Sequence, residues 1–181
     1  MPGLRQQLES CVSGSVCFIG LGNIHYRDDG FGVRLAEQLI AAGIRHVLVA
    51  GTAPDRFLGR LVHPNFDHVI FLDAADFGNA PGSAVVLNSS EMAARYPQIS
   101  THKISLALLA QFVEAGGSTK AWLLGVQPES LKAGEELTAT MKKSLAAIAG
   151  LLISLRNFES SNCDSPSLAE SSAEMKKAAN R

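Results

Sequence analysis

The chain has 181 residues, a length that fits one domain with a proper hydrophobic core and leaves little room for two. Its 16 Lys and Arg residues nearly balance its 17 Asp and Glu residues, and the net charge of -1 does not favour nucleic acid or anionic lipid as a partner. No apolar stretch reaches the roughly 20 residues that span a bilayer, and residues 1–7 lack the apolar core of a signal peptide. We therefore expect a cytoplasmic protein that acts on a small molecule or on another protein.

The first half of the chain alternates strand-like and helix-like hydrophobic patterns. In order, the patterns predict a strand at 15–22, a helix at 30–42, a strand at 47–50, a helix at 55–62 and a strand at 68–74. The strand at 68–74 is almost continuously apolar, which is typical of a central strand covered on both faces. This half therefore predicts a βαβαβ unit.

The second half adds a strand at 83–87, a helix at 102–115, a strand at 121–126 and a helix at 138–155. The connection between 74 and 83 is too short for a parallel crossover, so we expect the strand at 83–87 to run antiparallel to its neighbour. The elements together predict the α/β class, as a single three-layer α/β/α domain. Its twisted, mostly parallel sheet of about five strands contains one antiparallel strand and is flanked by helices.

The chain is expected to divide into three parts. Residues 1–14 form an N-terminal extension and residues 15–156 form the domain. Few large apolar residues follow Phe158, so residues 157–181 are expected to form a flexible C-terminal tail.

Two adjacent carboxylates, Asp28 and Asp29, lie between the first predicted strand and the first predicted helix. Open α/β folds bind their ligands at such βα turns. One of the two acids can cap the helix. Adjacent carboxylates repel each other, however, so the second acid is stabilised only by a cation or a shared proton. The pair therefore predicts one structural acid and one functional acid.

Gly20 and Gly22 follow the first strand and suggest a dinucleotide-binding turn. His25 stands at the third glycine position of GxGxxG, and the two neighbouring acids would repel a pyrophosphate. A tight turn with close backbone approach is the favoured interpretation of these glycines. A dinucleotide-binding enzyme remains as an alternative.

Asp73 lies at the carboxyl end of the most apolar strand, where a carboxylate is costly unless it is hydrogen-bonded, paired or bound to a cation. In a doubly wound sheet this strand end can adjoin the turn that carries Asp28 and Asp29. His102, at the start of the third predicted helix, adds an imidazole. Two carboxylates and one imidazole make an open three-ligand site for a divalent transition metal.

Seven short segments occur in order along the chain, at residues 19–23, 28–32, 51–55, 73–78, 81–82, 100–102 and 124–128. Together they resemble the maturation endopeptidases of nickel–iron hydrogenases. Each segment is a weak signal alone, whereas the ordered set is specific and spans about residues 15 to 155.

The resemblance implies a peptidase that removes the C-terminal extension from the precursor of a hydrogenase large subunit after nickel insertion. It implies that Asp29, Asp73 and His102 are the metal ligands and catalytic residues. The resemblance also implies that the nickel belongs to the substrate and that surrogate divalent metals can replace it. Supporting positions implied by the same motifs are Gly20, Gly22, Asn23, Asp28, Gly30 and Thr101. Two chemistries remain open, with a carboxylate as general base or with the metal polarising the peptide carbonyl.

A nickel-binding chaperone or sensor that does not hydrolyse its partner would use the same three ligands and is a second alternative. Other protease chemistries fit poorly, because the chain has no GxSxG elbow and no HExxH helix. The expected partner is the large-subunit precursor, recognised through loops such as 88–100 or near Gln127. A monomer is expected.

Overall fold

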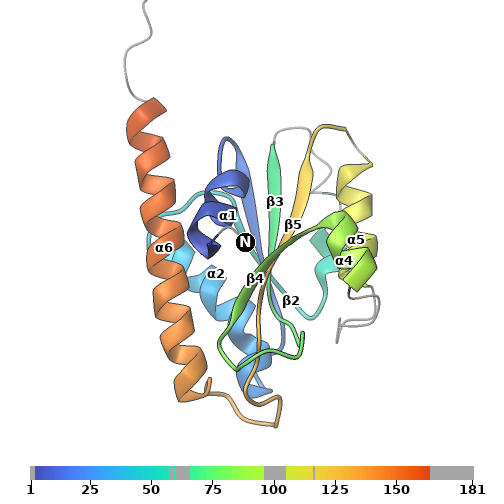
Figure 1. The fold of residues 1–181 in the computed structure, drawn as a ribbon, viewed down its shortest axis with the longest axis vertical. Coiled ribbons are helices and arrows are strands. Elements are labelled where there is room, and N and C mark those ends of the chain that lie inside the picture. The colour runs from blue at the N-terminus through green and yellow to red at the C-terminus, as the bar shows by residue number, and fades with distance from the viewer. Residues whose placement is uncertain (1–2, 58, 60–65, 96–104, 116, 164–181) are drawn as a thin grey trace, which may run out of the picture.

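The computed structural model describes residues 3–57, 59, 66–95, 105–115 and 117–163. A five-stranded sheet lies between two layers of helices (Figure 1). The strands are β1 (Val16–Leu21), β2 (Val47–Gly51), β3 (His68–Ala74), β4 (Ala84–Asn88) and β5 (Lys120–Val126). Their order across the sheet is β2-β1-β3-β5-β4.

The strand pairing confirms the predicted fold class. β1 is parallel to both β2 and β3, β5 is parallel to β3, and β4 is antiparallel to β5 at the sheet edge. All of β1 is buried, and β3 is buried after its first residue, because both strands are covered by helices on both faces. β4 is antiparallel as predicted, and it pairs with β5.

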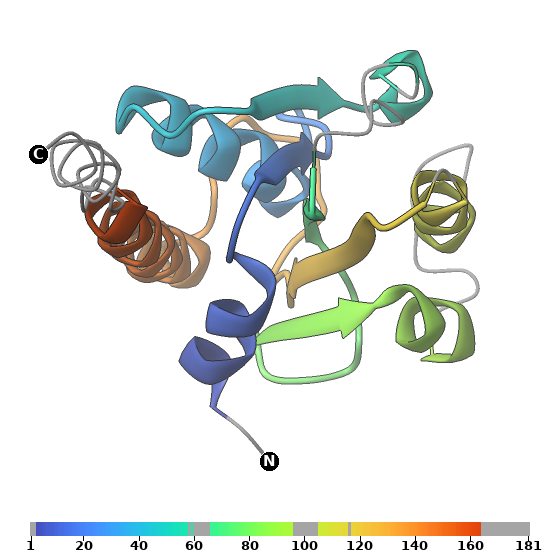
Figure 2. The same ribbon diagram turned by 90° about the horizontal axis from the view of Figure 1, so that it is seen from above.

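Helices cover the two faces of the sheet unequally (Figure 2). α1 (Leu4–Cys11), α2 (Phe31–Ala41) and α6 (Ala139–Cys163) pack on one face. α4 (Ser89–Arg95) and α5 (Leu106–Glu114) pack on the other. Two 3₁₀ turns, η1 (Arg27–Gly30) and η2 (Pro54–Phe57), follow β1 and β2. Each helical layer forms a separate hydrophobic core with its side of the sheet.

Several helices differ from the sequence prediction. The first predicted helix, 30–42, is confirmed as α2, and only its first residue, Gly30, belongs to the preceding turn η1. In the second, residues 54–57 form η2, and residues 58 and 60–65 lie outside the described residues. α5 begins at Leu106, and the predicted residues 102–104 also lie outside the described part. α4 was not predicted, because its seven residues are too few to show a helical period.

Both predicted terminal segments contribute helical structure. Residues 4–11 of the predicted extension form α1, whose Leu8 and Cys11 are buried in the core shared with α2 and α6. α6 continues from the predicted end at 155 to Cys163. Residues 164–181 of the predicted tail lie outside the described residues.

A search of the described residues finds no helix with the length and apolar character needed to cross a membrane. The cytoplasmic location stays a prediction.

Candidate functional site

The sequence-predicted acids meet where the strand order reverses. β1 lies between β2 and β3, and ligands of open α/β sheets bind beside such a reversal, at the carboxyl ends of the strands. Gly20 of β1 pairs with Leu72 of β3, so Asp73 comes one residue after the last position of β3 that pairs with β1. The carboxyl ends of the parallel strands lie at the bottom of Figure 1, beside the loop from β5 to α6. Asp29 in η1 and Asp73 in β3 therefore share one edge of the sheet.

Glycines let the start of α2 approach the strand ends closely. A Cβ atom on Gly32 would lie 1.9 Å from the carbonyl oxygen of Leu72 and 2.6 Å from that of Leu21. Gly22 has a φ of 113°, and a Cβ atom there would lie 1.7 Å from the carbonyl oxygen of Asp29. The backbone of Asp29 thus fills the space above Gly22 that a pyrophosphate would need. The tight-turn interpretation of these glycines is supported over the dinucleotide site.

Asp28 holds a distant loop instead of capping α2. Its carboxylate is fully buried and accepts hydrogen bonds from the backbone N–H groups of Glu129 (3.0 Å), Ser130 (2.8 Å) and Thr138 (2.8 Å). The Thr138 hydroxyl donates a further bond of 3.1 Å. No side chain caps α2, so the predicted helix cap is wrong. Asp28 instead fixes the loop between β5 and α6, which its position in the sequence does not reveal.

Asp29 and Asp73 are buried close enough to affect each other. Oδ2 of Asp29 accepts the backbone N–H of Asn23 at 2.8 Å, and Oδ1 is buried without a hydrogen-bond partner among the described residues. Burial, together with the charge of Asp29, raises the pKa of Asp73 well above its ordinary value. Two buried carboxylates that repel each other are stabilised by a proton or by a divalent cation. The pair can therefore supply two ligands of a metal site.

His102 and Thr101, the other predicted site residues on this side, lie outside the described residues. Ser105 is the N-cap of α5, and its hydroxyl oxygen accepts the N–H of Leu108 at 3.2 Å. At the other end of α5, Glu114 accepts the N–H of Ala121 at 3.0 Å, so α5 runs back along β5 and begins towards the edge that carries Asp73. Within the described residues, no group of three His, Cys, Asp or Glu side chains could hold a metal ion. The structure thus brings together two of the three predicted ligands.

Gln127 supports the segment beside the site, a role that the sequence analysis did not predict for it. It is buried directly after β5; its Oε1 accepts the N–H groups of Phe77 (2.9 Å) and Asn79 (3.2 Å), and its Nε2 donates to Asp76 (3.1 Å). These bonds fix the segment that follows Asp73. The buried amide of Gln127 does not itself present to a partner, and recognition of the precursor by the loop near Gln127 stays a prediction. A polar residue directly after a buried strand was the available signal.

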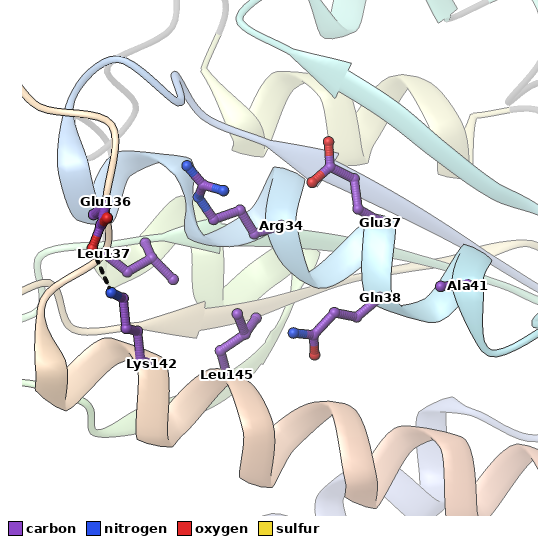
Figure 3. Close-up of a pocket in the computed structure, with 8 residues that line it drawn as sticks. All are labelled: Arg34, Glu37, Gln38, Ala41, Glu136, Leu137, Lys142 and Leu145. Carbon is purple, nitrogen blue, oxygen red and sulfur yellow. Dashed lines mark hydrogen bonds and ion pairs between the residues drawn. The ribbon is translucent and has the colours of Figure 1, made fainter.

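A groove of about 510 Å³ lies between α2 and α6 (Figure 3). Lys142 forms an ion pair with Glu136 at 2.6 Å, and the Arg34 guanidinium donates to the carbonyl oxygen of Glu135. The groove is lined by Arg34, Glu37, Gln38, Ala41, Glu136, Leu137, Lys142 and Leu145. None of the predicted site residues lines it, so the groove and the acidic pair are separate features.

Comparison with known proteins agrees with this architecture. The sequence model of the hydrogenase maturation protease family matches residues 33–155. Hydrogenase 2 maturation protease of Escherichia coli (strain K12) is 34% identical over 150 residues, covering 78% of this chain and 90% of the relative. Among solved structures, the maturation protease HycI of Thermococcus kodakarensis superposes with a TM-score of 0.73 and 28% identity over 82% of this chain and 97% of that one. The endopeptidase HybD of E. coli has a TM-score of 0.64 and 32% identity, and the match covers 80% of this chain and 93% of that one. The chain therefore belongs to the hydrogenase maturation protease family, and it is a hydrolytic enzyme of the peptidase class.

Proposed function

We propose that this chain cleaves the C-terminal extension from the large-subunit precursor of a nickel–iron hydrogenase after nickel has been inserted. Membership of the maturation protease family supports the reaction class. The observation that carries the proposal is the buried pair Asp29 and Asp73 at the carboxyl edge of the sheet. Open α/β folds bind their ligands at this carboxyl edge of the sheet.

The nickel of the substrate is the proposed recognition element. Asp29 and Asp73 each present a carboxylate, and His102 is the third ligand proposed. Burial and the charge of Asp29 raise the pKa of Asp73; a divalent cation held by the two acids would offset both, and Asp73 would release its proton on binding. A precursor without nickel offers no such compensation, so it would be rejected. This arrangement makes cleavage conditional on completed metal insertion.

The two carboxylates also limit how the peptide bond can be attacked. A carboxylate freed of its proton can act as general base towards water, or the substrate's metal can polarise the scissile carbonyl. Oδ1 of Asp29 lacks a hydrogen-bond partner among the described residues. This oxygen could accept a proton from water or bind the substrate's metal. Asn23 fixes the other oxygen of the same carboxylate and thereby its orientation.

The direct test is incubation with a matched, nickel-loaded precursor, followed by mass spectrometry of the large subunit. The expected result is loss of the C-terminal peptide, with the nickel-free precursor left intact. Absence of cleavage of the matched precursor would refute the peptidase proposal. Nickel-dependent binding without cleavage would favour the chaperone alternative.

Variants test the assigned residues. Asp29→Asn, Asp73→Asn and His102→Ala should each abolish cleavage, because each removes one proposed metal ligand. Glu37→Gln is a matched control, because it neutralises an exposed acid in the groove away from the pair. Circular dichroism should show a wild-type fold for all four. Unchanged cleavage in the three ligand variants would overturn the site assignment.

A further inference from the structure

Three large apolar side chains are exposed beside the acidic turn. Ile24 is 40% exposed, Tyr26 is 48% exposed and Leu131 is 43% exposed. Ile24 and Tyr26 lie in the loop between β1 and η1, and Leu131 lies in the loop between β5 and α6. We call these three side chains the apolar rim. Large apolar groups held in water at a functional edge mark a contact surface more often than scattered surface residues do.

The two loops of the rim are tied together by backbone hydrogen bonds. Arg27 donates to the carbonyl oxygen of Gly134 (2.6 Å), and Gly134 donates to that of His25 (2.9 Å). Asp28 donates to the carbonyl oxygen of Ser130 (3.2 Å), while its side chain accepts the N–H of Ser130. The rim is therefore presented on a fixed backbone, and little conformational entropy is lost when a partner binds to it.

The rim is continuous with the catalytic acid. The N–H of Asp29 donates to the carbonyl oxygen of Tyr26 at 3.0 Å, and its carboxylate accepts the N–H of Asn23, the residue before Ile24. A Cβ atom on Gly30 would lie 3.0 Å from Cα of Ile24. Asp29 is thus hydrogen-bonded to Asn23 and Tyr26 of the loop that carries the two exposed residues.

Polar side chains border the rim. His25 separates Ile24 from Tyr26, and its Nδ1 lies 3.8 Å from a carboxylate oxygen of Glu135. Both side chains are largely exposed. An apolar centre with a polar border is the usual composition of a protein-binding surface.

We propose that the apolar rim binds an apolar segment of the precursor next to its scissile peptide. The inference rests on the proposed function, because a protease must receive a polypeptide at its catalytic acids. The surface that touches Asp29 therefore contacts that polypeptide. The rim contributes binding and orientation of the precursor, whereas the acids contribute the chemistry.

The test compares Ile24→Ser/Tyr26→Ser with Ile40→Ser. Ile40 is a matched control, because it is also exposed (49%) but lies in the last turn of α2, about 13 Å along the helix from its start. The double variant should raise the Kd for immobilised nickel-loaded precursor and the KM of cleavage at least about tenfold, with kcat within about twofold. Leu131→Ser, from the second loop, should act in the same direction. Ile40→Ser should match wild type.

The outcomes separate this inference from the proposed function. Precursor binding that depends on the rim, without cleavage by any variant, would refute the peptidase proposal and support the rim. Cleavage with a wild-type KM in all rim variants would overturn the rim. Failure of the wild-type protein to bind the precursor would overturn it as well. Sedimentation could instead show that the wild type is a dimer and that the double variant is a monomer with unchanged precursor binding. In that case the rim binds a second copy of this chain, and the proposal is wrong.

Discussion

At the scale of single residues, neighbouring acids have unequal surroundings. Asp28 accepts four hydrogen bonds, which fix its side chain against the loop between β5 and α6. Asp29 accepts one hydrogen bond from Asn23 and has a second, buried oxygen without a partner in the described part of the chain. Because the cost of a buried carboxylate depends on its partners, Asp29 and Asp73 store electrostatic repulsion that Asp28 does not.

Asp73→Asn should stabilise the metal-free protein at neutral pH. Burial and the charge of Asp29 raise the pKa of Asp73, so the folded protein keeps a proton that the unfolded chain loses near pH 4. The stability contributed by this group is full below about pH 4 and is lost as pH rises through the folded pKa. Asn removes that loss, so the melting temperature should rise by at least about 3 °C at pH 7 and be nearly unchanged at pH 4. Calorimetry at both pH values measures the difference; a gain that does not vary with pH would contradict the explanation.

His68 should make the contact between β3 and β5 sensitive to acid. Its Nδ1 accepts the indole N–H of Trp122 at 3.0 Å, and burial lowers its pKa despite the opposing charge of Asp67. A lowered pKa means that stability is full above about pH 6.5 and is lost as pH falls through the folded pKa. Trp122 is the single tryptophan of the chain, so its fluorescence should change in this range. His68→Asn keeps a hydrogen-bond acceptor that does not titrate, so it should abolish the fluorescence change. If the fluorescence of this variant still changes with pH as in the wild type, a group other than His68 causes the change.

At the scale of elements, the site depends on how closely α2 meets the sheet. Gly20 and Gly32 face each other where α2 begins, and the missing side chains let the helix start lie on the ends of β1 and β3. This contact fixes η1, which carries both acids, relative to Asp73. Helix packing at a strand end is therefore part of the site.

Gly32→Ala should destabilise the protein by about 3 kcal/mol or more, because the added methyl group would meet two backbone carbonyl oxygens that cannot move away independently. Gly150→Ala is the control within α6, where an added Cβ meets nothing within 4 Å. That exposed helical position should gain about 0.5–1 kcal/mol. Urea denaturation gives both values. Equal effects of the two substitutions would show that the close approach of α2 is not required.

At the scale of the whole molecule, segments from both ends of the chain complete one core. α1 buries Leu8 and Cys11 against the layer formed by α2 and α6. Arg156 of α6 donates to the carbonyl oxygens of Val12 (2.7 Å) and Gly14 (3.0 Å), joining the last helix to the start of the chain. The N-terminal helix therefore belongs to the folded body.

Leu8→Ala should lower the free energy of unfolding by about 2–5 kcal/mol, because it leaves a cavity in this shared core. Gln6→Ala changes an exposed residue of the same helix and should have little effect. Thermal unfolding of the two variants measures the contribution of α1. A loss below about 1 kcal/mol for Leu8→Ala would mean that the helix is dispensable.

The sequence by itself determined the strands, the fold class and the edge at which Asp29 and Asp73 lie. Hydrophobic periodicity and strand ends are local properties, and they are readable because a buried strand needs an apolar run. The same local signals could not reveal α4, whose period is too short, or the packing of α1, which depends on surfaces far along the chain.

Only the tertiary structure decided which roles the polar groups take. The partners of Asp28 lie more than 100 residues away, and those of Gln127 about 50, so no local pattern contains them. Capping was a reasonable expectation for an acid at a helix start, but three loop N–H groups brought in by folding satisfied Asp28 instead. Asp28 and Asp29 were thus visible in the sequence as adjacent acids. That Asp28 holds a distant loop while Asp29 keeps a buried oxygen without a partner in the described part of the chain required the folded structure, because tertiary contacts set the hydrogen bonds of each carboxylate.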